Sequence, residues 1–85
     1  MDYIIDKRVF LIGSYLEEND ACLHSSAVSR CHARIFCTDE TCYLEDLGSK
    51  KGTFLNGERL AAGVQCRLES MDELRFGDVE YIFYA

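Results

Sequence analysis

Apolar residues in this chain come in short runs, and polar or glycine-containing stretches interrupt them roughly every eight to twelve residues. No stretch shows the long 3.6-residue periodicity of an extended helix. This spacing is typical of an all-β sandwich or barrel, and it predicts about nine to eleven short strands. The runs that carry them are residues 3–5, 8–12, 32–37, 42–46, 53–55, 58–60, 64–68, 73–76 and 79–84.

Turn signals join neighbouring runs into hairpins. The polar residues 38–41 form a four-residue loop between two of the runs. Asn56-Gly57 joins two others, and this pair is a strong hairpin signal because both turn positions favour positive φ. The two ends of the chain, residues 3–5 and 79–84, are both strand-like. Pairing between the two ends is therefore a further prediction.

Two segments do not read as strands. Residues 14–28 contain acidic and serine residues with few β-branched ones, and residues 47–52 form a loop that contains two glycines. In a sandwich the connections gather at the ends of the sheets, where recognition is usually located. The stretch 29–32 (SRCH) lies where the first segment enters a strand, and 49–52 (SKKG) lies where the second does. Both stretches are therefore placed on loops, which suits binding.

The charge balance limits the kinds of partner. The formal net charge is −6, from fifteen acidic residues against nine Lys and Arg. A field of this sign repels nucleic acid, so no nucleic-acid partner is predicted. Four of the nine basic residues nevertheless fall in two short segments: Arg30, Arg34, Lys50 and Lys51. If folding brings those segments together, an acidic protein carries a local anion site.

Length and cysteine usage indicate the setting. With 85 residues the chain holds one small domain, so we expect a single domain over residues 1–85, cut from a longer protein and monomeric in isolation. No apolar run approaches the ~18 residues of a membrane span, and the first residues lack the basic start of a signal peptide. The cysteines are odd in number and include no Cys-x-x-Cys pair. Reduced, mostly buried thiols in the cytoplasm are predicted, with no membrane partner.

The stretch 29–32 raises three chemistries. A Cys31–His32 dyad is disfavoured because neighbouring side chains in an extended segment point to opposite faces. A Ser29–His32 pair could converge across a tight turn, but nothing obvious supplies the orienting acid and the oxyanion hole. Zinc is disfavoured because Cys31, His32, Cys37 and Cys42 fit no common ligand spacing. Phosphate binding is favoured, since a serine hydroxyl, a guanidinium and two lysines all lie on loops. No catalytic residue, metal or cofactor is predicted.

The order of the motifs resembles the forkhead-associated (FHA) family of phosphothreonine-peptide-binding domains, in particular bacterial ones. The resemblance runs from about residue 9 to 83 and lies in five motifs: 10–13 (FLIG), 28–35 (VSRCHARI), 43–49 (YLEDLGS), 52–57 (GTFLNG) and 72–77 (DELRFG). It implies an FHA-type β-sandwich of about eleven short, mainly antiparallel strands with binding loops at one end. It further implies phosphothreonine-dependent protein–protein recognition in signalling, through loops around residues 14–31 and 47–52. The partner would be the product of a separate Ser/Thr kinase.

The resemblance also assigns expected roles to single residues. Ser29 matches the serine that hydrogen-bonds phosphate, Arg30 a frequent second phosphate contact, and His32 the histidine that braces the loops. Positions expected to shape the pocket, the second loop and the following turn are Gly13, Gly52, Thr53, Asn56 and Gly57.

Two positions depart from the family pattern. Ser14 stands where the family usually has the phosphate-holding arginine, and a serine cannot supply a charged bidentate fork. Lys51, preceded by Lys50, stands where the family tends to have an asparagine that grips the peptide backbone. Two outcomes stay open. In one, the domain binds a phosphopeptide through a degenerate phosphate pocket, in which Ser14 donates a neutral hydrogen bond and Lys50 and Lys51 restore part of the lost charge. In the other, the domain is a scaffold that binds its partner without phosphate.

Overall fold

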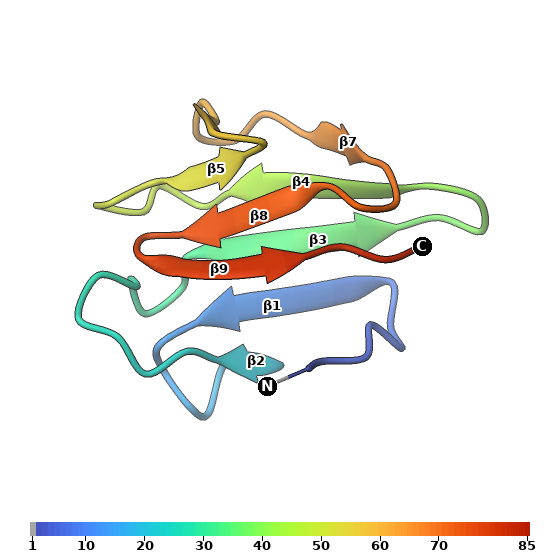
Figure 1. Cartoon of the computed structure of the whole chain (residues 1–85). Helices are drawn as coiled ribbons and strands as arrows, with labels where there is room; N and C mark the ends of the chain where they lie inside the picture. Colours follow the sequence, from blue (N-terminus) through green and yellow to red (C-terminus); the bar gives the residue numbers. More distant parts are fainter. Residues whose placement is uncertain (1) are drawn as a thin grey trace.

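The computed structural model describes residues 2–85 as two packed β-sheets (Figure 1). No helix occurs among these residues, and so none that is long and apolar enough to cross a membrane. Nine strands follow one another along this part of the chain: β1 (Val9–Gly13), β2 (Ala21–Cys22), β3 (Ala33–Cys37), β4 (Cys42–Asp46), β5 (Thr53–Leu55), β6 (Glu58–Arg59), β7 (Cys66–Leu68), β8 (Glu73–Phe76) and β9 (Val79–Ile82).

The strands divide into a five-stranded sheet and a four-stranded sheet. The first has the order β2-β1-β3-β4-β7, and the second has the order β6-β5-β8-β9. Neighbouring strands are antiparallel except for β1 and β2, which pair in parallel. The predicted all-β, mainly antiparallel sandwich is confirmed.

The strand predictions match best where alternation and turn signals are local. Residues 42–46 and 73–76 coincide with β4 and β8. The run 3–5 forms no strand, so the predicted pairing of the two ends is wrong; instead the rings of Tyr3 and Tyr81 meet edge-on, 5.9 Å between centroids. The two-residue β2 lies inside a segment predicted to hold no strand. The described residues form nine strands, within the nine to eleven that the pattern predicts and fewer than the eleven or so that the resemblance implies.

The core lies between the two sheets and follows from alternation along each strand. In the five-stranded sheet Phe10, Ile12 and Ile35 point inward and are buried, and Leu74 and Phe76 of β8 meet them from the other sheet. Burying each large apolar side chain contributes roughly 1.5–3 kcal/mol. This core holds the strand ends in fixed positions.

The connections relevant to recognition gather at one end of the sandwich. In Figure 1 the arrows of β1, β4 and β8 end at the left, where β3, β5 and β9 begin. The segment that follows β1, the loop 47–52 and the turn between β8 and β9 therefore lie at this end. The sequence predicted binding loops at one end of a sandwich, and the topology places them there.

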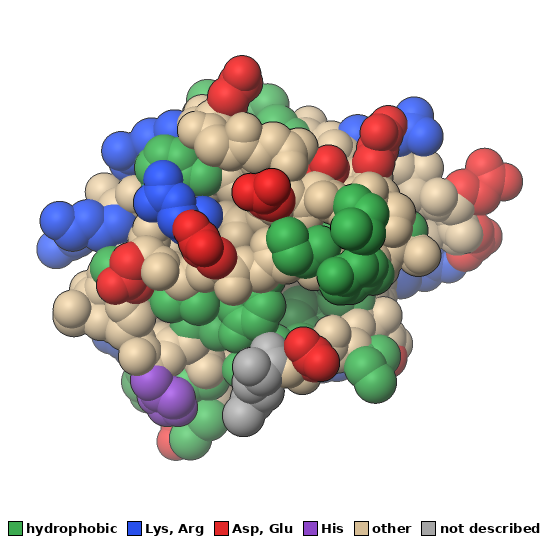
Figure 2. Space-filling model, in the orientation of Figure 1, with side chains coloured by type: hydrophobic (Ala, Val, Ile, Leu, Met, Phe, Trp, Pro, Cys, Tyr) green, Lys and Arg blue, Asp and Glu red, His purple; other side chains and the backbone are tan. Residues whose placement is uncertain are grey.

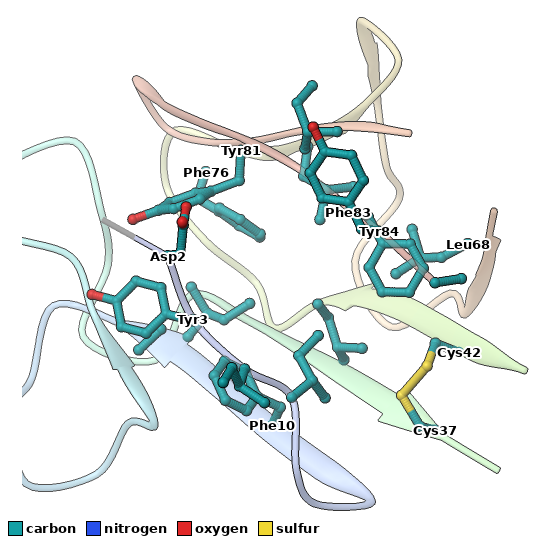
Figure 3. A pocket seen from close by; sticks show the side chains of 18 of the residues that line it. Asp2, Tyr3, Phe10, Cys37, Cys42, Leu68, Phe76, Tyr81, Phe83 and Tyr84 are labelled. Atoms are coloured by element: carbon teal, nitrogen blue, oxygen red, sulfur yellow. A yellow bond between two sulfur atoms is a disulfide. The ribbon is translucent and has the colours of Figure 1, made fainter. Parts of the chain in front are cut away.

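A cavity of about 680 Å³ lies between the two sheets (Figure 3). Tyr3 and Phe10 line it from one side and Tyr81 and Phe83 from the other. None of the predicted binding residues lines it. The candidate recognition surface is therefore an open set of loops and not this cavity.

The cysteines differ from the prediction. Cys37 and Cys42 form a disulfide beside the cavity in Figure 3, whereas all five were predicted to be reduced. The cause is register: the two residues lie directly opposite each other in the β3–β4 ladder, where side chains are in contact. Cys22, Cys31 and Cys66 are free thiols, and Cys31 is exposed rather than buried. The cytoplasmic location stays a prediction.

Candidate functional site

One buried carboxylate organises the loop 47–52. Asp46, the last residue of β4, is 4% exposed, and its oxygens accept hydrogen bonds from the backbone N–H groups of Gly48 (3.0 Å) and Ser49 (3.1 Å). The hydroxyls of Ser49 and Thr53 donate to it as well, the latter at 2.7 Å. Burial alone would raise the pKa of Asp46, but these hydrogen bonds outweigh burial and hold that pKa below its ordinary value. The loop is thus built around an ionised aspartate.

Gly52 ends this loop in a conformation that favours glycine. Its φ is +92°, in the left-handed region, and a Cβ here would come within 2.8 Å of the Arg59 side chain. Its N–H donates to the Ser49 hydroxyl at 3.0 Å, and its carbonyl accepts from the Gly77 N–H at 2.9 Å. Gly52 therefore closes the loop on Ser49 and fixes it against the turn between β8 and β9.

His32 connects the two loop regions. Its ring is fully buried and packs edge-on against Phe76, 6.0 Å between ring centroids. Nδ1 accepts a hydrogen bond from the Ser29 N–H at 3.0 Å, so Nε2 carries the ring proton and donates to the Gly52 carbonyl at 2.8 Å. The imidazole thus spans residues 29 and 52, which is the bracing geometry that the resemblance implied.

Ser29 lies where the two regions meet. Its Oγ accepts a hydrogen bond from the Lys50 backbone N–H at 3.1 Å, and its carbonyl accepts one from the Ser14 N–H at 3.0 Å. A hydroxyl and a backbone N–H from different loops are therefore within hydrogen-bond distance of each other. The Ser29 hydroxyl keeps its own proton to donate to an anion, and the Lys50 N–H, which donates to Oγ here, is close enough to turn to the same anion.

Arg30 follows at the surface. Its guanidinium lies over the ring of Tyr15, 4.4 Å from the centroid, which is cation–π geometry. Its carbonyl accepts a hydrogen bond from the Asn19 side-chain amide at 2.7 Å. Gly13, at the end of β1, is required here because a Cβ would collide with this same carbonyl. The Arg30 backbone is held firmly while its charge stays exposed.

The lysine pair is exposed and carries no ion pair. The salt bridges in the described part of the chain are Lys7–Asp20, Arg8–Asp39 and Arg34–Glu45. The pair Arg34–Glu45 bridges β3 and β4, so Arg34 does not join the predicted anion site. In Figure 2, Lys and Arg side chains gather at the left edge. The segment that follows β1 and the loop 47–52 lie at the same end in Figure 1.

Asn56 and Gly57 form the predicted turn, but away from the loops. Their φ angles are +50° and +85°, and they lie at the other end of β5 from Gly52. The Asn56 amide donates to Asp72 at 3.0 Å and accepts from the Glu73 N–H at 2.9 Å. These two residues therefore shape the hairpin and do not lie with Ser29.

Sequence reasoning assigned no part to four residues that build this end of the molecule. Asp46 was placed in a strand, although an aspartate followed within three residues by Gly and Ser is a signal for side-chain-to-backbone hydrogen bonds. Tyr15 and Asn19, which contact Arg30, and Arg59, which contacts the loop 47–52, gave no local signal. Their contacts depend on tertiary structure.

A catalytic arrangement is not formed by the polar residues here. The exposed Cys31 thiol lies 3.2 Å from a Glu18 carboxylate oxygen, and this hydrogen bond raises the pKa of the thiol. Both nitrogens of His32 are engaged elsewhere. Among residues 2–85 no three His, Cys, Asp or Glu side chains are placed to hold a metal ion.

The fold and this end of it define a class of protein: a β-sandwich recognition module whose loops offer hydrogen-bond donors and free cations. The family model of the FHA domain matches residues 10–77, so the chain belongs to the FHA-domain family. Domains of this family are recognition modules.

Solved structures show the same fold. EmbR of Mycobacterium tuberculosis, in complex with a low-affinity phosphopeptide, is 31% identical with a TM-score of 0.86, over 94% of this chain and 20% of that one. The FhaA FHA domain, complexed with the intracellular domain of Rv3910, is 28% identical with a TM-score of 0.84, over 94% of this chain and 84% of that one.

Curated relatives are much longer than this chain. Human kanadaptin is 39% identical over 75 residues, which cover 75% of this chain and 10% of that protein. FraH of Nostoc sp. is 34% identical over 61 residues, covering 72% of this chain and 21% of that protein. The chain thus spans about a tenth to a fifth of the length of these relatives.

Proposed function

We propose that this domain binds a phosphothreonine segment of a partner protein across residues 14–31 and 47–52. The observation that carries the proposal is the meeting of the Ser29 hydroxyl and the Lys50 N–H at 3.1 Å. A phosphate offers three acceptor oxygens and about −1.5 to −2 charges at neutral pH. The Ser29 hydroxyl therefore donates to one phosphate oxygen, the Lys50 N–H turns from Ser29 Oγ to another, and Arg30 supplies charge from the side.

The solved neighbours support this reading. EmbR is bound to a phosphopeptide in its structure, and the FhaA FHA domain is bound to a partner protein's intracellular domain. The function is recognition in signalling; no reaction and no cofactor form part of it. The phosphate comes from a separate Ser/Thr kinase.

Ser14 sets the expected affinity. Ser14 replaces the arginine that the family usually has at this position. A charge-assisted hydrogen bond is worth roughly 1.5–3 kcal/mol, so binding is expected to be about ten- to a hundred-fold weaker than with that arginine. Lys50 and Lys51 restore part of this as point charges, since both are exposed and carry no carboxylate partner among residues 2–85. Binding therefore depends strongly on salt, as expected for exposed charges.

The test compares matched phosphothreonine, phosphoserine and unphosphorylated peptide pools by fluorescence polarisation. We expect a clear preference for phosphothreonine. Ser29→Ala and Arg30→Ala should each weaken it about ten-fold or more without unfolding the domain, because each removes one phosphate contact. Changing Lys50 and Lys51 together to Ala should remove most of the affinity that the domain keeps despite Ser14, and should reduce the salt dependence of binding.

The control variant is Arg67→Ala, since Arg67 is an exposed arginine on β7 outside the loops. Its affinity should equal that of the unchanged protein. Unchanged affinity in both the Ser29 and Arg30 variants would reject the pocket assignment. Equal binding of all three pools by a folded domain would instead favour a scaffold that recognises its partner without phosphate.

A further inference from the structure

Arg59 reaches from β6 to the loop 47–52. Its Nη2 donates to the Lys50 carbonyl at 3.4 Å, and a Cβ on Gly52 would meet its Nε at 2.8 Å and its Cζ at 3.0 Å. The guanidinium therefore lies directly against Gly52. Neither the resemblance nor the charge clustering in the sequence pointed to this residue.

Most of the hydrogen-bonding capacity of Arg59 is unused. A guanidinium has five N–H donors, and the described contacts use one, on a neutral carbonyl. Two other arginines of the sheets differ: Arg34 pairs with Glu45, and Arg75 lies over Phe54 and donates to a carbonyl. Arg59 thus presents an exposed, planar fork of donors, which matches a carboxylate in two-point geometry.

The same residue, Lys50, connects Arg59 to Ser29. Its carbonyl accepts from Arg59, and its N–H donates to the Ser29 hydroxyl. Ser29 Oγ and Arg59 Nη2 are therefore at most about 10 Å apart, a span that about three residues of extended peptide cover. A peptide with its phosphate at Ser29 can place a neighbouring side chain at Arg59.

The exposed charges nearest to Arg59 are also positive. Lys50 and Lys51 belong to the loop that Arg59 contacts, and they have no carboxylate partner among residues 2–85. An acidic residue of the ligand is attracted to these cations as well as to Arg59. Because an extended peptide runs in one direction from the phosphate, only the residues on one side of the phosphothreonine come near Arg59.

We propose that Arg59 is a specificity-determining residue that selects phosphothreonine peptides with an Asp or Glu within about three residues, on one side of the phosphothreonine only. This inference rests on the proposed function and deepens it, because it names the chemistry of the partner segment next to the phosphate.

The experiment uses a phosphothreonine peptide with alanine at every flanking position. Single Asp, Glu, Asn or Gln residues replace each alanine within four positions on either side, and the dissociation constants are measured by fluorescence polarisation. We expect one acidic position to bind about ten-fold tighter than its amide counterpart, on one side of the phosphothreonine. In Arg59→Gln that ratio should fall below about two-fold, since charge-assisted contacts are the stronger ones.

Two further variants separate specificity from a structural effect. Arg67→Gln removes an exposed arginine of β7 and should keep the full ratio. Arg59→Lys keeps the charge but loses the fork, and should give an intermediate ratio that salt removes. Circular dichroism checks that each variant is folded.

The outcomes distinguish this inference from the function on which it rests. Phosphothreonine binding with no acidic preference, or with a preference that survives Arg59→Gln, would overturn the role of Arg59 and leave the proposed function intact. An equal loss of affinity for all peptides in Arg59→Gln would make Arg59 a support for the loop, not a specificity residue. No preference for phosphothreonine over threonine in any peptide would overturn both.

Discussion

The two regions that form the recognition end are held in place by different means. The loop 47–52 is stabilised from inside: Asp46 accepts hydrogen bonds from the loop backbone and from Ser49 and Thr53. Residues 14–31 are held by scattered contacts: the Asn19 amide donates to the Tyr15 and Arg30 carbonyls, the Ser25 hydroxyl donates to Asp78, and His32 accepts from the Ser29 N–H. The loop 47–52 is therefore held in its conformation by nearby residues of its own sequence. The position of Ser29 depends instead on His32 and on Lys50 of the other loop.

The largest effect is expected for Asp46→Ala. This change removes the acceptor for two hydroxyls and two N–H groups in a buried site, so we expect a loss of about 4 kcal/mol in the free energy of unfolding. Urea denaturation measures it. Asp39→Ala is the control, because its carboxylate forms an exposed pair with Arg8, and it should change stability by less than about 1 kcal/mol.

Acid titration tests the same carboxylate without a deletion. The folded-state pKa of Asp46 lies below its ordinary value of 3.8, so its contribution to stability is present above that pH and is lost as pH falls through the folded pKa. Asp46→Asn removes this titration and should flatten the fall in stability at acid pH. An unaltered acid slope in that variant would mean that Asp46 is not the anchor of the loop.

A smaller effect is expected for His32→Ala. It removes hydrogen bonds at both ends of the ring and leaves a cavity beside Phe76, at a cost of about 2 kcal/mol. Thermal unfolding should shift down by about 10 °C for a domain of this size. His24→Ala, at an exposed position, should leave the transition unchanged. A stable but binding-deficient His32 variant would locate its effect in Ser29 and not in the fold.

The contrast between the two regions also explains how much the sequence reveals. Strands β4 and β8 and the Asn56-Gly57 turn follow from local alternation and turn chemistry, and the sequence predicts them. Ser29 and His32 lie together as the resemblance implies, and Lys50 joins them as the clustering of basic residues predicted. The loop 47–52 also has a local signal, because Asp46 is followed within three residues by Gly48 and Ser49.

What the sequence did not reveal depends on register and tertiary packing. The parallel β1–β2 pair has only two residues in β2, too few for a periodic signal. The Cys37–Cys42 disulfide and the Arg34–Glu45 pair both follow from which residues are opposite in the β3–β4 ladder. Arg59 contacts the loop only after β6 folds back on β5. Such contacts are set by the fold as a whole.

The smallest effect is expected for Ser14→Arg, which adds a charge to residues 14–31 and leaves the loop 47–52 untouched. The Ser14 N–H donates to the Ser29 carbonyl, so an arginine side chain here starts beside the residue whose hydroxyl is proposed to contact the phosphate. A further charge-assisted contact should tighten phosphothreonine binding about ten-fold and steepen its salt dependence. Isothermal titration at two salt concentrations measures both.

Ser14→Gln is the matched control for length, because it reaches out from the same position without a charge. It should leave the affinity within about two-fold, since a neutral hydrogen bond contributes little net free energy. Weaker binding in Ser14→Arg, with Ser14→Gln unchanged, would show that the exposed guanidinium of Arg30 repels the new charge. In that case residues 14–31 accommodate one cation, Arg30, and repulsion of a second cation, not the shape of the segment, limits the affinity.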